Sequence, residues 1–175
     1  MIRQDISENL VKCVYLSLGS NLGDRRKNIE DAKHLLINNK IFIEDTSSYY
    51  ETYSWPNKNF PKFYNIILKV KTNMSLTNLF KILKNIEKQL GRKNTPRNHP
   101  RVCDIDIIDY NSLCLKSQLD DDYIETPHPR MNKRNFVIFP LYEVNKTWIH
   151  PKSKLTISSL INQLDNLDFS DIRIV

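Results

Sequence analysis

The stretch Pro100-Arg101-Val102-Cys103-Asp104-Ile105-Asp106-Ile107-Ile108-Asp109-Tyr110 predicts a β-strand, because β-branched and apolar residues dominate it and it contains no glycine and no internal proline. Alternate strand residues share a face, so Asp104 and Asp106 are expected to point the same way. Paired carboxylates suit Mg²⁺, which usually takes one or two of them and leaves its other positions to water and phosphate. Arg92 and Arg101 could supply positive charge to the same phosphates. The stretch favours metal-assisted phosphoryl transfer, although this pattern alone is more often a solvated sheet face.

Outward from this strand, the chain alternates between strand-like and helix-like patterns. The patterns predict strands at Cys13–Leu18, Ile41–Thr52 and Phe63–Lys71, a helix capped by Asp24 or Asn28, and a strong helix that Ser75 caps and Gly91 ends.

The element order is β-α-β-β-α-β, which predicts an α+β fold with a ferredoxin-like antiparallel sheet and both helices on one face. Additional C-terminal elements follow, with a weak helical pattern over Leu155–Leu164. The length predicts one domain, residues 1–175, with a core of about residues 13–145.

The composition excludes several classes of protein. No apolar run is long enough to span a membrane, and the first residues lack the features of a secretory signal. The cysteines, Cys13, Cys103 and Cys114, are odd in number and lack metal-ligand spacing, which favours a reducing compartment. We therefore expect a cytoplasmic protein with no membrane partner.

The net charge of +6 raises the question of nucleic-acid binding. The lysines are scattered, and the chain has neither zinc-finger spacing nor a recognisable RNA-recognition aromatic motif. We expect no nucleic-acid partner, since a basic cleft for a polyphosphate ligand would use the same charge.

Three further motifs have a structural and a functional interpretation. The segment Gly19–Gly23 resembles a phosphate loop in outline but lacks the Walker ending, so a tight turn is the better interpretation. In Pro127–Phe136, prolines flank His128 and the cations Arg130, Lys133 and Arg134 follow, which favours contact with a polyphosphate. An aromatic slot with an amide could read a flat heterocycle, although core packing explains the same residues, which are Trp55, Phe63, Asn65 and Phe136.

Four segments together resemble the 6-hydroxymethyl-7,8-dihydropterin pyrophosphokinase family. They are YLSLGSNLGDRRKNIEDA, the pair SSYYET and FYNIILKV, PRVCDIDIIDY, and TPHPRMNKRNFVIFPLYEV, and they span most of residues 14–144. The resemblance implies a 2-amino-4-hydroxy-6-hydroxymethyldihydropteridine diphosphokinase of folate biosynthesis. Such an enzyme transfers the β,γ-pyrophosphoryl group of ATP to the hydroxymethyl oxygen of the dihydropterin and releases AMP. The resemblance also implies a ferredoxin-like fold.

The resemblance further implies residue roles. Asp104 and Asp106 would bind two Mg²⁺ ions, and Arg92 and Arg101 would be the catalytic cations of a mobile loop. ATP would contact Lys84, Glu87, Ile107, His128 and Arg134. The pterin would contact Thr52, Tyr53, Trp55, Phe63, Asn65 and Phe136, with the two phenylalanines on either side of its ring. The partners would be the small molecules ATP and 6-hydroxymethyl-7,8-dihydropterin, bound by a monomer.

The chain departs from the family in the loop before Arg101. Many members carry an aromatic residue there, whereas this chain has Arg97-Asn98-His99-Pro100, so the resemblance does not extend to aromatic stacking from the loop Lys93–Pro100. The alternative function is a non-catalytic ferredoxin-like nucleotide- or RNA-binding module. It would require solvent-facing aromatics on the central strands, where this chain has carboxylates. A non-enzymatic ATP sensor is disfavoured by the intact aspartate pair and arginines.

Overall fold

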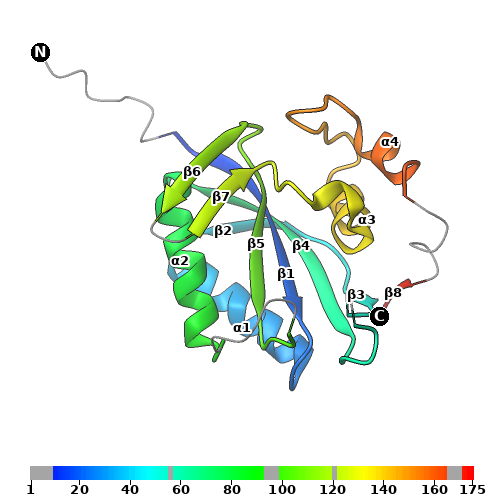
Figure 1. Ribbon diagram of the computed structural model, residues 1–175. Helices are drawn as coiled ribbons and strands as arrows, with labels where there is room; N and C mark the ends of the chain where they lie inside the picture. Colours follow the sequence, from blue (N-terminus) through cyan, green and yellow to red (C-terminus); the bar gives the residue numbers. More distant parts are fainter. Residues whose placement is uncertain (1–9, 55–56, 93–98, 120–121, 165–170) are drawn as a thin grey trace, which may run out of the picture.

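An antiparallel sheet with β1 and β4 near its centre organises the protein. The computed structural model describes residues 10–54, 57–92, 99–119, 122–164 and 171–175. The main sheet has the order β5-β1-β4-β3-β8, and β2 also pairs with β4 (Figure 1). Its strands are β1 (Lys12–Ser20), β2 (Phe42–Thr46), β3 (Tyr50–Thr52), β4 (Phe63–Thr72), β5 (Asp104–Tyr110) and β8 (Ile172–Ile174).

The two long helices lie on the same face of this sheet, as the sequence predicts (Figure 1). They are α1 (Arg25–Asn38) and α2 (Leu76–Gln89). Asp24 caps α1 by accepting a hydrogen bond from the Lys27 backbone N–H at 3.0 Å, and Ser75 caps α2 through the Asn78 N–H at 3.3 Å. Gly91, with a φ of +92°, follows α2 in a conformation that favours glycine.

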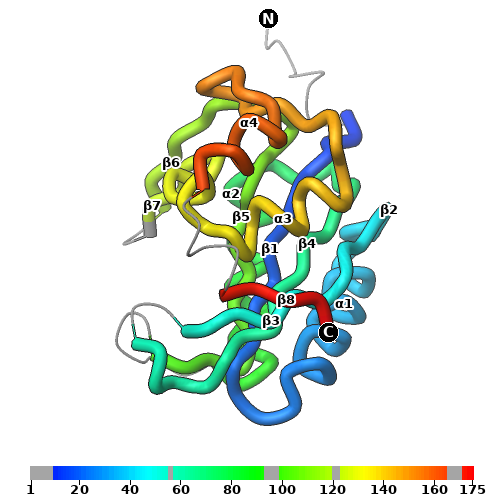
Figure 2. The backbone as a smooth tube through the Cα atoms, turned by 90° about the vertical axis from the view of Figure 1, so that its right-hand side faces the viewer, coloured from blue at the N-terminus to red at the C-terminus, as the bar shows by residue number. Residues whose placement is uncertain are grey.

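A second hydrophobic cluster covers part of the opposite face of the sheet. There, α3 (Asn135–Val144) and α4 (Ile157–Ile161) pack on sheet residues that include Tyr15, Ile67 and Ile108. Figure 2 shows α3 and α4 in front of the upper part of the sheet and β8 below them. The lower end of this face therefore stays outside the helical layer, and the candidate site lies there.

The predicted strand Ile41–Thr52 is wrong as one continuous element, because it is divided into β2 and β3. Between them, Ser47 donates its backbone N–H to the Ile67 carbonyl at 2.9 Å, while its hydroxyl accepts from the Ile67 N–H at 2.9 Å. A side-chain oxygen thus takes the place of a backbone carbonyl in the ladder, and the strand is interrupted.

The additional C-terminal elements include a hairpin and a helix that the sequence patterns do not predict. The strands β6 (Leu115–Leu119) and β7 (Asp122–Thr126) form a separate two-stranded sheet. Helix α3 has Pro140 in its interior, which removes a backbone donor and hides the helical signal. The weak helical pattern over Leu155–Leu164 corresponds to the shorter α4.

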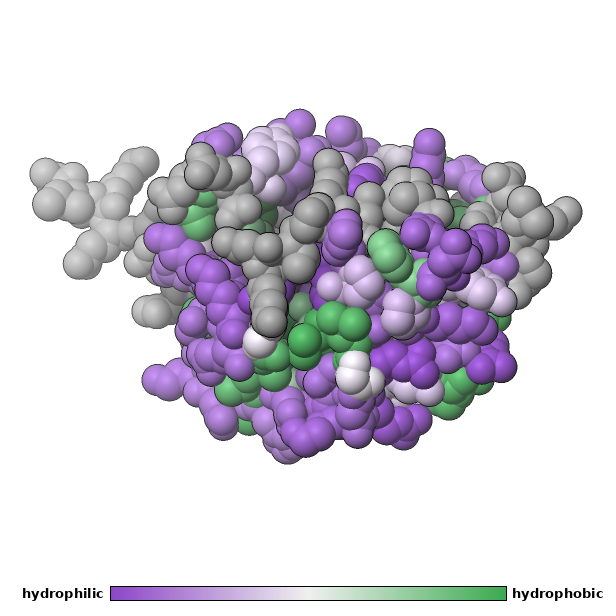
Figure 3. All heavy atoms as spheres, turned by 60° about the horizontal axis from the view of Figure 1, so that its bottom comes forward, coloured by the Kyte–Doolittle hydropathy of each residue, from purple (hydrophilic) through white to green (hydrophobic). Residues whose placement is uncertain are grey.

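Hydrophilic residues make up most of the coloured part of the face in Figure 3. Figure 3 shows one face, on which an apolar area is surrounded by hydrophilic residues. Within the part of the chain that the structure describes, no helix is both long enough and apolar enough to cross a membrane.

Candidate active site

Strand β5 presents Asp104 and Asp106 on the face of the sheet opposite α1 and α2. Asp104 lies across from Gly19 of β1, and Asp106 lies across from Ser17. Ile105, between the two aspartates, and Ile107, directly after them, are buried in the core beneath α1 and α2. The predicted alternation is confirmed, and both carboxylates remain partly accessible to solvent.

Two arginines hold the Asp104 carboxylate. Arg92 Nη1 lies 2.6 Å from Oδ1 and Arg101 Nη1 lies 2.6 Å from Oδ2. Burial opposes ionisation of Asp104, but Arg101 and Arg92 outweigh it and hold its pKa below the usual value. Asp104 is therefore an anion in contact with two cations. A metal ion that bound Asp104 would be a third cation at the same carboxylate.

Arg101 is fixed to the first strand–helix connection by Asn21. The Asn21 side-chain oxygen accepts from the Arg101 N–H at 2.7 Å, and the Asn21 N–H donates to the Arg101 carbonyl at 3.1 Å. Asn21 itself is buried and also donates its amide to the Pro61 carbonyl at 3.1 Å. The loop after β1 is thus a support for the Arg101 backbone as well as a turn.

Glu87 of α2 extends the charged network into the protein. Its carboxylate is 1% exposed and accepts a hydrogen bond from the Ile105 N–H at 2.7 Å. Lys84 Nζ lies 2.9 Å away and Arg92 Nη1 lies 2.5 Å away. Burial raises the pKa of Glu87, although Lys84 and Arg92 counteract it. Because Arg92 contacts both Glu87 and Asp104, the network spans from α2 to β5.

Asp106 has its own partners, Arg134 and His128, on the segment before α3. Arg134 Nη1 lies 3.0 Å from Asp106 Oδ2, and His128 Nε2 lies 3.8 Å from the same oxygen. Burial lowers the pKa of His128, Asp106 raises it, and Arg134 lowers it, so the net direction is downward. The His128 backbone N–H donates to the Ile108 carbonyl at 2.9 Å, which fixes this segment beside β5.

We call this assembly of Asp104, Asp106, Arg92, Arg101 and Arg134 the charged half of the site. Its donor set fits Mg²⁺, because two hard carboxylates share one face and Mg²⁺ usually takes its other ligands from water and phosphate. No cluster of three or more histidine, cysteine or acidic side chains with metal-binding geometry occurs in the described ranges.

Beside it lies a set of uncharged residues, the neutral half, formed by Gly19, Thr52, Phe63 and Asn65. In the sheet register, Asn65 of β4 lies across from Gly19, and Phe63 lies across from Thr52 of β3. The Asn65 amide donates to the Thr52 hydroxyl at 2.9 Å, and both side chains are buried. Since Asp104 is also paired with Gly19, a single row across three strands joins the two halves.

Gly19 is required by the close approach of these neighbours. A Cβ at this position would lie 2.9 Å from Asn65 Oδ1 and 3.5 Å from the Phe63 ring. Its role is therefore not that of a turn residue with positive φ, which belongs to Gly23 at +62°. The sequence pattern missed this role of Gly19 and that of Asn21, because both depend on strands that are distant in the sequence.

The other candidate residues are less clearly part of the site. The Phe136 ring packs at the edge of the α3 cluster and lies 5.5 Å from the Arg134 guanidinium. Tyr53 is largely exposed, with Lys62 Nζ 4.4 Å from its ring centre. The side chain of Ile107 lies in the core, so it leaves only its backbone for a ligand. Trp55 and residues 93–98 lie outside the described residues.

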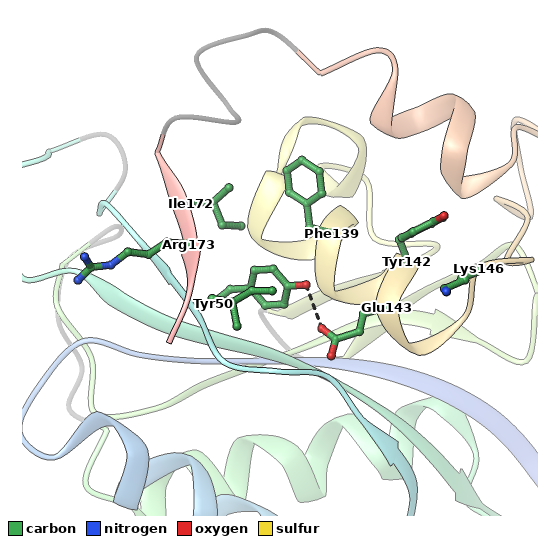
Figure 4. A pocket seen from close by; sticks show the side chains of 8 residues that line it. Tyr50, Phe139, Tyr142, Glu143, Lys146, Ile172 and Arg173 are labelled. Carbon is green, nitrogen blue, oxygen red and sulfur yellow. Dashed lines mark hydrogen bonds between the residues drawn. The ribbon is translucent and has the colours of Figure 1, made fainter.

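A separate groove lies between α3 and β8. It has a volume of about 460 Å³ and a mostly apolar lining that includes Tyr50, Phe139, Ile172 and Ile174 (Figure 4). At its floor, the Tyr50 hydroxyl donates to Glu143 Oε2 at 2.9 Å. The lining contains none of the aspartates or arginines of the charged half.

Comparison with known proteins shows which family this chain resembles. The family model described as 7,8-dihydro-6-hydroxymethylpterin-pyrophosphokinase (HPPK) matches residues 15–146. The 2-amino-4-hydroxy-6-hydroxymethyldihydropteridine pyrophosphokinase of Aquifex aeolicus is 38% identical over 138 residues, which cover 79% of this chain and 83% of that protein.

Longer proteins contain a similar part. The folic acid synthesis protein FOL1 of Dictyostelium discoideum is 41% identical over 153 residues, which cover 87% of this chain but 22% of that protein. The chain thus spans about a fifth of the length of this relative. The crystal structure of wild-type Plasmodium falciparum HPPK-DHPS with pteroate has a TM-score of 0.70 at 18% identity, over 89% of this chain and 42% of that chain. This likeness shows a shared fold.

Proposed function

We propose that this chain, which belongs to the 7,8-dihydro-6-hydroxymethylpterin-pyrophosphokinase family, transfers the β,γ-pyrophosphoryl group of ATP to 6-hydroxymethyl-7,8-dihydropterin. The hydroxymethyl oxygen attacks the β-phosphorus, the bond from that phosphorus to the α,β-bridging oxygen breaks, and AMP leaves as the hydroxyl proton is lost. The observation that supports this most is the row Asp104–Gly19–Asn65, which joins a charged half to a neutral half.

The charged half would hold the triphosphate. Asp104 and Asp106 would bind two Mg²⁺ ions, which when bound neutralise the phosphate charge and hold the reacting groups in line. Arg134 and His128 would contact phosphate oxygens, and Arg92 and Arg101 would neutralise charge that develops on the transferred group. Lys84, Glu87 and the Ile107 backbone would lie near the nucleotide.

An exchange of ion-pair partners would accompany ATP binding. The arginines of the charged half contact Asp104 and Asp106 in the structure. With Asp104 and Asp106 holding Mg²⁺, the guanidinium groups would be available to the phosphates, so that opposite charges would remain paired before and after binding. The arginines would thus change partners without passing through an unpaired state in a partly buried site.

The neutral half would bind the pterin. The Asn65 amide and the Thr52 hydroxyl, which already bond to each other, would hydrogen-bond the edge of the ring. Phe63 and Phe136 would pack on its two faces, and Tyr53 and Trp55 would add contacts from the adjoining loop. No side chain need accept the substrate proton, because phosphoryl transfer depends on alignment and charge neutralisation.

We also propose that the core is ferredoxin-like. The order β5-β1-β4, with β2 and β3 both on β4, supports this assignment when β2 and β3 count as one interrupted strand. We propose a single domain over residues 1–175 that acts as a monomer.

One assay tests the reaction. AMP formation from ATP and Mg²⁺ should depend strictly on added 6-hydroxymethyl-7,8-dihydropterin, and the pterin diphosphate should form in equal amount. ATP hydrolysis at a rate that does not depend on the pterin, or RNA binding without turnover, would contradict the proposal.

Calorimetry tests the order of binding. The pterin should bind weakly alone and much more tightly with Mg²⁺ and a non-hydrolysable ATP analogue, because ATP would complete the pterin site. Equal affinity under both conditions would disprove this coupling.

A further inference from the structure

The short strand β8 lies outside the part of the chain that matches the family model, which ends at residue 146. It pairs antiparallel with β3, so that Thr52 is across from Ile172 and Glu51 is across from Arg173. The Val175 N–H continues the pairing by donating to the Tyr49 carbonyl at 3.0 Å. Strand β8 is therefore attached to the same short strand that carries Thr52 of the neutral half.

The two faces of β8 make different contacts. Figure 4 shows Ile172 and Arg173 directed to opposite sides of the strand. Ile172 and Ile174 line the apolar groove beside α3, whose lining also includes Phe139. Arg173 instead reaches Glu51 on the other face, with Nε 2.9 Å and Nη2 2.5 Å from Glu51 Oε2.

Glu51 is a buried carboxylate with three cationic neighbours. Its side chain is 7% exposed, and Arg25 Nη1 lies 3.1 Å and Lys62 Nζ lies 3.6 Å from its oxygens. Arg25 is itself held by the Lys62 carbonyl at 2.9 Å and by the Tyr64 ring, whose centre is 3.7 Å from its guanidinium carbon. Arg25 and Lys62 would still compensate Glu51 if Arg173 were removed.

This cluster lies directly behind the neutral half. Glu51 and Thr52 are consecutive residues of β3, so their side chains point to opposite faces of the sheet. Glu51 is held by cations on one face, while the Thr52 hydroxyl accepts from the Asn65 amide on the other. Before β8, Asp171 pairs with Lys58 at 2.6 Å, which links the C-terminal segment to the connection between β3 and β4 as well.

We propose that Arg173 is a positioning residue for the pterin, because its contact with Glu51 holds β3 in place and so fixes the Thr52 hydroxyl and the Asn65 amide. This inference rests on the proposed function. β3 is short, with β4 paired along one edge and β8 along the other, and the Arg173–Glu51 contact adds a side-chain link between β3 and β8. A hydrogen-bonding pair that recognises one edge of a flat ring loses affinity when one member shifts by a fraction of an ångström.

The test is Arg173→Ala in the full chain. The Michaelis constant for the pterin, and its dissociation constant in the presence of Mg²⁺ and a non-hydrolysable ATP analogue, should both rise about 5- to 10-fold. The kcat and the dissociation constant of the ATP analogue should stay within about twofold, because the charged half is built on β5, α2 and the segment before α3. Arg173→Lys should recover part of the pterin affinity through its charge.

A matched control is Lys71→Ala. Lys71 is also an exposed cation in a cross-strand ion pair, with Glu44, but it lies at the far end of β4 from the neutral half. This substitution should leave the pterin constants unchanged. A general loss of folded protein would lower the active fraction without changing either Michaelis constant, so the split between the pterin and ATP constants separates positioning from stability.

The outcomes distinguish this inference from the proposed function. If the unsubstituted protein forms AMP in a pterin-dependent way and Arg173→Ala keeps its pterin constants, the positioning role is wrong and the proposed function stands. If the unsubstituted protein neither binds the pterin nor forms AMP, the proposed function fails, and this inference fails with it.

Discussion

The charged and neutral halves of the site are built in opposite ways. In the charged half, Asp104 and Asp106 are held by arginines that come from three separate segments of the chain. In the neutral half, Thr52 and Asn65 satisfy each other by one buried hydrogen bond on adjacent strands. Charged groups in a partly buried site need partners at every stage, so ligand binding there must exchange one ion pair for another.

The neutral half has no such requirement. Its geometry follows from the sheet register and from the missing side chain of Gly19. Substitutions in the charged half should therefore alter rate and metal binding, whereas substitutions in the neutral half should alter pterin affinity. Four experiments test this division, and a fifth tests the burial of His128.

The largest effect is expected from Asp104→Ala, with the same result for Asp106→Ala. Turnover should fall by more than about 10³-fold, because the loss of a metal ligand removes several kcal/mol of charge stabilisation. Steady-state AMP formation measures the rate, and circular dichroism checks the fold. The control Asp45→Ala removes an exposed carboxylate of β2 and should keep full activity. Near-native activity of a folded Asp104→Ala protein in Mg²⁺ would show that the metal assignment is wrong.

The next effect concerns Arg92→Ala and Arg101→Ala. Either should lower kcat on the order of 10³-fold with only a modest change in the ATP dissociation constant, since the guanidinium acts on charge that develops in the transition state. Lysine should rescue poorly, because a point charge cannot reproduce the bidentate fork. Single-turnover kinetics and ATP titrations separate the two quantities. An intact kcat with badly weakened ATP binding would show that these residues only anchor the nucleotide.

Gly19→Ala should act on the neutral half. The new methyl group would lie 2.9 Å from Asn65 Oδ1, and displacement of the amide should weaken pterin binding about 10- to 100-fold. Calorimetry with the ATP analogue present measures it. In an Asn65→Ala background the same substitution should weaken pterin binding much less, because the amide that it displaces is gone. Equal costs in both backgrounds would refute the close-approach argument.

A smaller effect tests the exchange of partners directly. Without nucleotide, Arg101→Ala should tighten Mn²⁺ binding several-fold, because a cation that competes for Asp104 is lost. Electron paramagnetic resonance of free Mn²⁺ gives the affinity. Lys116→Ala, which removes an exposed cation of the β6–β7 hairpin, should leave it unchanged. Unaltered or weaker Mn²⁺ binding in Arg101→Ala would mean that the arginine does not compete with the metal.

The smallest effect is a pH dependence of stability. Burial lowers the pKa of His128 below its unfolded value of 6.5. Below pH 6.5 the unfolded chain therefore binds a proton that the folded chain does not, so stability is lost as the pH falls through 6.5 towards the folded pKa. His128→Asn should remove about 1 kcal/mol or less of this loss in the free energy of unfolding. Urea unfolding at pH 7 and pH 5.5 measures the difference. His34→Asn, on the exposed side of α1, is the control. Identical pH slopes for the parent and His128→Asn would contradict the burial argument.

Much of the fold could be predicted because its signals are local. Ser75 and Gly91 mark the ends of α2 through groups within a few residues, and the apolar stripe of α2 identifies its buried face. The strand division at Ser47 could not be predicted, since it depends on the Ile67 backbone, 20 residues away. Helix α3 was hidden for a different reason, because Pro140 contradicts the local pattern and packing against the sheet overrides it.

The candidate site divides in the same way. The sequence alone determined that Asp104 and Asp106 share a face, because alternation is a property of any extended strand. The sequence also identified the family, because its motifs combine particular residue types at fixed spacings.

Which groups meet depends on the tertiary structure: Arg101 is anchored by Asn21 80 residues away, Asn65 approaches Gly19, and Arg173 reaches Glu51 across 122 residues. The physical reason is that strand order and register bring these residues together. Both depend on the free energy of packing the whole sheet, and no local propensity contains them.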